Sequence, residues 1–177
     1  MPQKKVLLHK SEIEDRLCEL AEEVALDYAG KPLVVIAVLS GGIVIASDFM
    51  RCLWENGFEE IIFDTVKVSS YGENTVSSAR PELVKDVQID LAGEHVLVVE
   101  DIVDTGYTLD LLLRHLADKQ PASLETLALL RKPDTVRRVE VPVKYIGFDV
   151  SDVWIEGYGI DTAERGRGNP NIVQVLA

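Results

Sequence analysis

The chain has 177 residues, a length that suits one domain able to bury well over half of its unfolded surface. Hydrophobic residues make up 47% and charged residues 27%, which excludes a disordered chain and a cysteine-dense secreted scaffold. Thirty acidic residues against eighteen Lys and Arg give a formal net charge of -12, which disfavours general nucleic-acid binding. A phosphate site would therefore depend on local backbone N–H groups, a few cations and bound metal.

The N-terminal part of the sequence predicts an amphipathic helix over residues 11–28, with Ser11 as its N-cap and Glu14 completing a capping box. The residues before it lack the apolar stretch of a secretory signal, so we expect a cytoplasmic protein. Cys18 and Cys52 lack the paired spacing of a zinc site or a redox motif. Both are expected to be buried thiols in a reducing compartment.

The most apolar window, residues 33–50, predicts a buried strand and a helix rather than a membrane span. Its first half is rich in Val and Ile and fits a strand over 33–39, after which Ser40-Gly41-Gly42 forms a turn. A helix is predicted over roughly 43–56 and a strand over 61–68. This strand–helix–strand order indicates an α/β domain, and no membrane association is expected.

The rest of the chain continues this alternation. Residues 69–81 are small and polar without periodicity, which predicts a mobile surface loop and a candidate lid. The elements predicted after the loop are a strand, a helix and two further strands, over residues 96–99, 109–119, 124–130 and 143–150. Such alternation predicts a mainly parallel sheet flanked by helices.

An acidic turn follows the strand that begins at residue 96. Glu100 and Asp101 end the apolar run, and Asp104 follows in a turn that opens a helix. The N–H groups at a helix start bind phosphate, and neighbouring carboxylates on a strand reach different parts of one ligand, such as ribose hydroxyls or hydrated Mg²⁺. The alternative is a turn that only caps the helix. Three carboxylates, two threonines and a glycine in this order favour the phosphate site, in a chain without the dinucleotide-binding and P-loop glycine patterns.

The run from Val98 to Thr108 resembles the phosphoribosyl diphosphate motif of the type I phosphoribosyltransferases, in particular of their hypoxanthine-guanine branch. Further matching runs occur in the family's order, at residues 39–42, 69–72, 130–133, 145–148 and 157–161. The resemblance implies the family's α/β fold in a single domain over 1–177, with a core over about 31–131. A small hood would be formed by the N-terminal segment and about 150–177.

The resemblance implies magnesium-dependent transfer of ribose 5-phosphate from phosphoribosyl diphosphate to a 6-oxopurine in purine salvage. Glu100 and Asp101 would hold the ribose hydroxyls, and Asp104, which begins the phosphate loop, would also handle the proton at N7 of the base. Arg167 matches the arginine that contacts pyrophosphate, with Arg165 as a close competitor. The residues implied to bind phosphoribosyl diphosphate are Ser40, Gly41, Glu100, Asp101, Asp104, Thr105, Gly106, Tyr107, Thr108 and Arg167.

Three further residues are implied to bind the base. Lys132 would donate to the 6-oxo group, Trp154 would stack on the ring and the backbone of Ile155 would read the ring edge. From the residues alone, a solvated lysine at a strand end and an aromatic in the core remain alternatives. Asp161 matches a magnesium ligand, with Glu100 and Asp101 as the other carboxylates near the metal.

Ser70 and Tyr71 match the Ser-Tyr pair of the family's mobile loop, which closes over the reactants and limits hydrolysis. An ordinary flexible loop is the alternative for this composition. Two positions depart from the family: Ser40 stands where a lysine is frequent, and Tyr107 where the phosphate loop often has a smaller or basic residue. The family's cis peptide before position 40 can still be present, because pyrophosphate needs backbone N–H groups there.

Two other functions remain open at this stage. One is a regulator with the same fold that senses phosphoribosyl diphosphate or a nucleotide and acts on RNA or a protein. The other is a transferase for another base, such as a pyrimidine or xanthine. The acidic charge and the presence of Ser70, Tyr71 and Asp104 favour the enzyme. Its expected partners are the two substrates and further copies of itself in a homodimer or homotetramer, with no nucleic acid or membrane.

Overall fold

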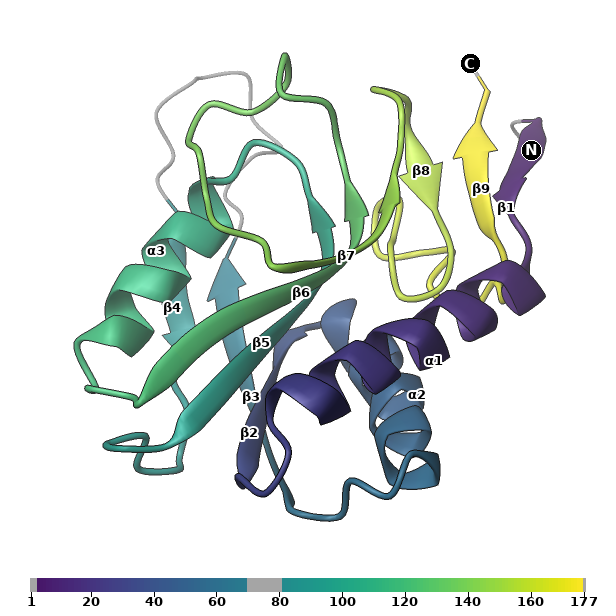
Figure 1. The fold of residues 1–177 in the computed structure, drawn as a ribbon. Helices are drawn as coiled ribbons and strands as arrows, with labels where there is room; N and C mark the ends of the chain where they lie inside the picture. The colour runs from purple at the N-terminus through teal and green to yellow at the C-terminus, as the bar shows by residue number, and fades with distance from the viewer. Residues whose placement is uncertain (1–2, 70–80, 177) are drawn as a thin grey trace.

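A six-stranded sheet forms the centre of the computed structural model, which describes residues 3–69 and 81–176 (Figure 1). Its strands are β2 (Leu33–Leu39), β3 (Ile61–Ser69), β4 (Glu82–Lys85), β5 (His95–Val103), β6 (Ser123–Arg131) and β7 (Tyr145–Asp149). They lie in the order β4-β3-β2-β5-β6-β7, and every neighbouring pair is parallel except β3 with β4. The predicted α/β fold with a mainly parallel sheet is confirmed.

Helices cover both faces of this sheet. They are α1 (Lys10–Asp27), α2 (Gly42–Glu55) and α3 (Tyr107–Ala117). Leu33 and Val35 of β2 pack in one core with α1 and α2, whereas Val34 and Ile36 pack in a second core with α3. A strand buried on both faces must be apolar at every position, which explains the continuous Val/Ile run of β2. None of the helices in the described ranges is both long and apolar enough to cross a membrane.

A second, antiparallel sheet is built from segments near the two ends of the chain. It has the strands β1 (Lys4–Leu8), β8 (Ile155–Glu156) and β9 (Ile172–Val175), in the order β1-β9-β8. The N-terminal and C-terminal strands therefore lie side by side (Figure 1). Lys4 of β1 forms an ion pair with the buried carboxylate of Glu156 in β8. This sheet is the hood that the resemblance implied.

The start of α1 differs from the prediction. His9 is the N-cap residue, and its N–H donates to the carboxylate of Glu12 at 2.8 Å. The predicted N-cap at Ser11, with Glu14 in the capping box, was therefore wrong by two residues. Asn171 explains the earlier start, because its side-chain oxygen accepts the N–H of Lys10 at 2.9 Å and satisfies one of the helix's first donors.

A disulfide between Cys18 and Cys52 joins α1 to α2, with the two Cα atoms 5.0 Å apart. The prediction of two free thiols was wrong. The two cysteines are 34 residues apart in the sequence, and they meet because α1 and α2 pack against the same face of the sheet. Spacing along the chain contained no sign of this pairing.

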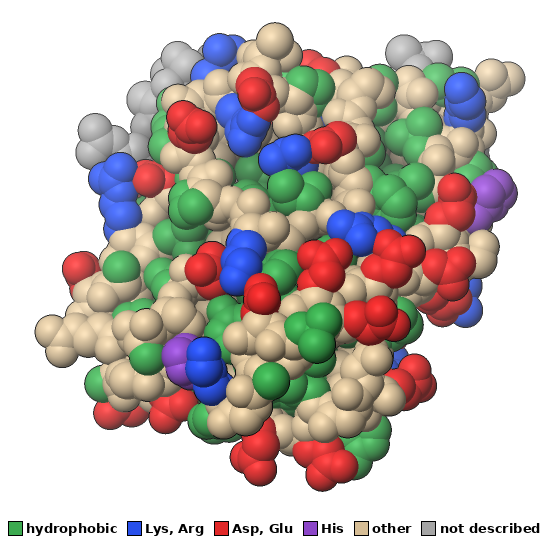
Figure 2. All heavy atoms as spheres, viewed as in Figure 1, with side chains coloured by type: hydrophobic (Ala, Val, Ile, Leu, Met, Phe, Trp, Pro, Cys, Tyr) green, Lys and Arg blue, Asp and Glu red, His purple; other side chains and the backbone are tan. Residues whose placement is uncertain are grey.

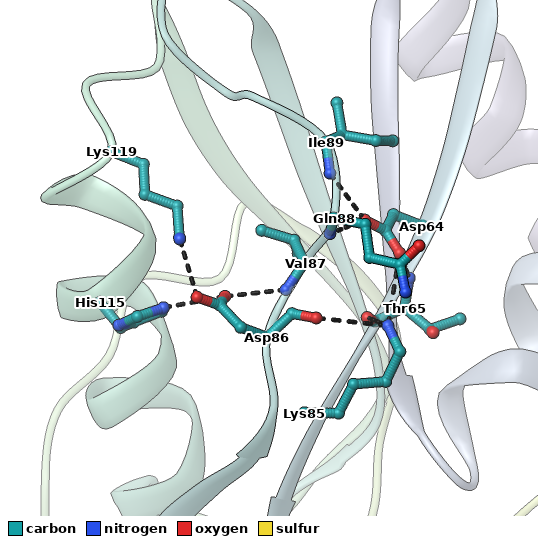
Figure 3. Close-up of polar contacts among 9 residues, drawn as sticks. All are labelled: Asp64, Thr65, Lys85, Asp86, Val87, Gln88, Ile89, His115 and Lys119. Carbon is teal, nitrogen blue, oxygen red and sulfur yellow. Dashed lines mark hydrogen bonds and ion pairs between the residues drawn. The ribbon is translucent and has the colours of Figure 1, made fainter.

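The connection between β4 and β5 is held on both sides by carboxylates (Figure 3). Asp64 in β3 accepts the N–H of Gln88 at 2.5 Å. Asp86 contacts His115, near the end of α3, at 2.9 Å, and Lys119, two residues after α3, at 2.8 Å. Burial alone would raise the pKa of Asp86. The hydrogen bonds from Lys119 and His115 outweigh this effect and lower the pKa to about 2. This connection is therefore fastened to β3 and to α3.

Candidate active site

Three segments converge around Gly41 at the carboxyl edge of the large sheet. Gly41 follows the cis peptide bond between Leu39 and Ser40, and a Cβ atom on it would lie 1.6 Å from Oδ2 of Asp101 in β5. A Cβ on Gly159, from the segment after β8, would lie 2.4 Å from the carbonyl oxygen of Gly41. The turn after β2, the end of β5 and the hood therefore touch one another. In parallel sheets this edge is the usual place for a ligand site.

Glu100 and Asp101 form a buried acidic pair inside β5, which continues to Val103 rather than ending at residue 99 as predicted. Glu100 is only 7% exposed, and its carboxylate accepts the N–H of Asp101 at 3.2 Å. Burial, together with the charge of Asp101, raises the pKa of Glu100 well above its usual range. Burial likewise raises the pKa of Asp101, while the charge of Arg167 lowers it. Ionising both carboxylates therefore costs free energy unless a cation or hydroxyl donors bind to them.

Glu100→Gln is therefore expected to stabilise the fold at neutral pH. Below the ordinary carboxyl pKa, Glu100 is protonated in both the folded and unfolded states and its pKa shift costs nothing. As the pH rises from there to the raised folded-state pKa, the unfolded chain ionises first and the free energy of unfolding falls. Removing the titrating group cancels this loss. We expect the Tm of the variant to exceed that of the wild type by about 2–4 °C at pH 7.5, and the difference to vanish near pH 4.

Thermal unfolding followed by circular dichroism at several pH values measures this effect. Glu22→Gln is the matched control, because Glu22 lies exposed on α1 and the same chemical change should leave the pH dependence of Tm unaltered. A Glu100→Gln protein less stable than the wild type at pH 7.5 would show that the ionised carboxylate contributes favourable contacts that outweigh its burial.

The acidic turn after β5 lines a hollow at the start of α3. Its lining residues are Glu100, Ile102, Val103, Asp104, Thr105, Gly106, Thr108 and Leu109. Gly106 has a φ of +88°, and a Cβ on it would lie 2.4 Å from the carbonyl oxygen of Val139, so the position requires glycine. The carbonyl of Thr105 accepts the N–H groups of Arg138 and Val139, at 2.9 and 3.1 Å. The first N–H groups of α3 have no acceptor within the helix and are therefore available for an anion.

A second hollow lies next to the first. It is lined by Ile102, Asp104, Lys132, Val153, Trp154, Ile155, Ile160 and Asp161. Trp154 is 63% exposed, and its indole N–H donates to the hydroxyl of Thr162 at 2.8 Å, which fixes the ring while much of its surface stays open. Oδ1 of Asp104 is buried and has no hydrogen-bond partner within the described parts of the chain. Asp104 lines both hollows, so one carboxylate can act on ligands in each.

The segment that follows β8 brings Asp161 and Arg167 together. Nη2 of Arg167 lies 2.7 Å from Oδ1 of Asp161, and Nη1 donates to the carbonyl oxygen of Gly159 at 2.8 Å. Arg165 instead has an exposed side chain, and its backbone pairs with Thr162. The charge of Arg167 also lowers the pKa of Asp101.

The structure thus brings together the segments that the sequence singled out, and adds residues that sequence reasoning missed. Ser70 and Tyr71 lie outside the described residues. The missed residues are Asp152, whose carboxylate contacts Lys132, and Thr162, which holds Trp154. Neither has a local sequence signal, because each contact joins segments that meet only in the fold.

Comparisons with known proteins identify the family of this chain. A family model described as the phosphoribosyl transferase domain matches residues 4–163. The chain is 39% identical over 170 residues to a hypoxanthine-guanine phosphoribosyltransferase of Mycobacterium tuberculosis, covering 93% of this chain and 82% of the relative. It is 40% identical over 174 residues to a hypoxanthine phosphoribosyltransferase of Haemophilus influenzae, covering 97% and 94%.

Solved structures give the same result. A crystal structure of a hypoxanthine-guanine phosphoribosyltransferase from Bacillus anthracis matches with a TM-score of 0.89 and 35% identity, covering 99% of both chains. A hypoxanthine phosphoribosyltransferase of Trypanosoma cruzi matches with a TM-score of 0.88 and 35% identity, covering 97% of this chain and 90% of the other. The family match, these identities and the acidic site at the sheet edge all agree, and this chain belongs to the phosphoribosyltransferase family.

Proposed function

We propose that this chain transfers ribose 5-phosphate from phosphoribosyl diphosphate to a 6-oxopurine, and so acts in purine salvage. Hypoxanthine is the first candidate base, followed by guanine and xanthine. The observation that carries the proposal is the pair of adjoining hollows with Asp104 in both, one at a helix start and the other lined by Lys132 and Trp154. The relatives' names point to the same chemistry.

The second hollow suits the base. The ammonium of Lys132 donates a hydrogen bond to the 6-oxo group, whereas the 6-amino group of adenine would present a donor to it. Trp154 offers its open ring for stacking, and the backbone of Ile155 meets the edge of the base. Oδ1 of Asp104, which has no hydrogen-bond partner over residues 3–69 and 81–176, supports a role in accepting the proton from N7 of the base.

The first hollow suits the sugar phosphate. The N–H groups of residues 105–108 bind the 5-phosphate at the start of α3. Glu100 and Asp101 accept hydrogen bonds from the ribose hydroxyls, and such donors offset the cost of ionising this buried pair. Backbone groups of Ser40 and Gly41, with the guanidinium of Arg167, bind the pyrophosphate.

The transfer breaks one bond at C1 of the ribose, forms another and moves one proton. The bond between C1 and the pyrophosphate oxygen breaks, and C1 gains oxocarbenium character. The bond from the purine N9 to C1 forms, while the N7 proton passes to Asp104. Arg167 and the N–H groups near Gly41 stabilise the negative charge that collects on the leaving group. The products are the nucleoside monophosphate and pyrophosphate.

The acidic residues of the site also fit Mg²⁺, the cofactor in this proposal. Asp161 would supply a hard oxygen ligand, and Glu100 and Asp101 would supply two more. The raised pKa values of this pair support the fit, since crowded carboxylates are relieved by a divalent cation, and the charge of Asp161 itself raises the pKa of Asp101. When bound, magnesium neutralises charge on the pyrophosphate.

A direct assay tests the function. We expect the purified protein with phosphoribosyl diphosphate and Mg²⁺ to convert hypoxanthine, guanine or xanthine to its nucleotide, at least about 100-fold faster than adenine, and EDTA to abolish the reaction. Chromatography of the products identifies each nucleotide. Binding of phosphoribosyl diphosphate without turnover of any base would instead favour a nucleotide-sensing regulator. Turnover of a pyrimidine alone would reassign the substrate.

Two further features belong to the same proposal. A cytoplasmic location suits an enzyme whose substrate is a highly charged phosphate ester that does not cross membranes. Assembly into an oligomer, for which we propose a homodimer or homotetramer, is supported by the T. cruzi relative, whose C-terminal region has a role in its oligomeric state. The exposed side chains of Trp54 in α2 and Phe63 in β3 offer apolar surface for such contacts.

A further inference from the structure

Lys132 lies between two carboxylates at the edge of the second hollow. Its Nζ is 3.0 Å from Oδ1 of Asp152 and 3.7 Å from Oδ2 of Asp104. The lysine side chain is 13% exposed, so most of its length is enclosed. An ammonium group has three N–H donors and no acceptor. One of them donates to Asp152, whereas Oδ2 of Asp104 lies beyond hydrogen-bond distance, so the other two remain for a ligand in the hollow.

The strand order explains why this contact forms. Lys132 follows β6 and Asp152 follows β7, and these parallel neighbours end at the same edge of the sheet. Arg131 and Asp149 hold the two ends together by hydrogen bonds of 2.7 and 3.0 Å. The bend that carries Asp152 is closed by a hydrogen bond from the N–H of Val153 to the carbonyl oxygen of Ser151, at 2.9 Å. Asp152 is therefore presented to Lys132 by a fixed backbone.

We propose that Asp152 is a positioning residue that sets the preference for 6-oxopurines by holding the Lys132 ammonium toward the base. This inference rests on the proposed function, because it concerns recognition of the 6-oxo group. Asp104 cannot do this alone, since its oxygen is farther from Nζ and the same carboxylate takes part in the proton transfer. Asp152 is 61% exposed, so removing its carboxylate opens no cavity in the core and takes away the nearest acceptor of the Lys132 ammonium.

A double-mutant cycle isolates this role. The proteins are the wild type, Asp152→Ala, Lys132→Ala and the double variant, with KM for hypoxanthine, KM for phosphoribosyl diphosphate and kcat measured for each. We expect Asp152→Ala to raise KM for hypoxanthine about fivefold, the size of a partly exposed ion pair, with kcat and KM for phosphoribosyl diphosphate within about twofold of the wild type. In the Lys132→Ala background, Asp152→Ala should change nothing further.

Asp134→Asn is the matched control, because Asp134 is an exposed carboxylate two residues after Lys132 that pairs with Arg137 instead of Lys132. It should leave KM for hypoxanthine unchanged. Where turnover of Lys132→Ala is too slow to measure, calorimetric binding of inosine monophosphate completes the cycle. Equal losses from Asp152→Ala in both backgrounds, or no change in KM, would overturn the role of Asp152. A wild-type protein that makes no nucleotide from any 6-oxopurine would overturn the proposed function itself, and this inference with it.

Discussion

Asp104→Asn is expected to lower kcat with hypoxanthine by about 100- to 10,000-fold while leaving the fold intact. Asparagine has nearly the same shape as aspartate but cannot take the N7 proton. The native fold should tolerate the change, because Oδ1 of Asp104 has no hydrogen-bond partner among the described residues and Oδ2 only approaches Lys132 at 3.7 Å. The loss should therefore appear in catalysis and not in Tm.

Steady-state kinetics at saturating substrates, together with thermal unfolding, measures both quantities. Asp110→Asn is a suitable control because Asp110 lies on the same helix start, where its carboxylate bonds Arg114 at 3.0 Å on the surface. It should keep wild-type kcat. If Asp104→Asn also kept wild-type kcat, the N7 proton would have to leave by another route and Asp104 would only help to bind the phosphate.

The central elements of the fold could be predicted because their signals are local. The Val/Ile run of β2 was placed at residues 33–39, where the structure has it, since a strand buried on both faces must be apolar throughout. Strand β1 received no prediction. Three of its five residues are exposed, and its partner is β9 at the other end of the chain. A short strand of this kind is stabilised by its neighbour and leaves almost no pattern in its own sequence.

The same distinction applies to the site. Glu100, Asp101 and Asp104 could be singled out because they follow one another after an apolar run. The contact of Lys132 with Asp152 could not, because it depends on β6 and β7 being neighbours in the sheet. The predictions for the two cysteines and for the start of α1 were wrong for the same reason. In both cases a partner distant in sequence, Cys52 for Cys18 and Asn171 for Lys10, decided a local outcome.

Gly41→Ala should disable the site by a different route, through the position of Asp101. The backbone of Gly41 has φ -68° and ψ -41°, which alanine adopts readily. Its Cβ would nevertheless lie 1.6 Å from Oδ2 of Asp101, and the carboxylate would have to rotate away. Moving a carboxylate that is proposed to bind the ribose and the metal should lower kcat/KM for phosphoribosyl diphosphate about 100-fold. The change in Tm should be small, because only the end of one side chain moves.

Two other glycines make this prediction specific. Gly168→Ala places its Cβ in open space and should preserve both activity and Tm. Gly42→Ala brings its Cβ to 2.6 Å from the backbone oxygen of Val99, so the start of α2 must move away from β5 and Tm should fall. Kinetics and thermal unfolding of the three variants therefore separate a lost ligand contact from a lost packing contact. A Gly41→Ala protein with normal kcat/KM would mean that catalysis does not require the Asp101 carboxylate where β5 holds it.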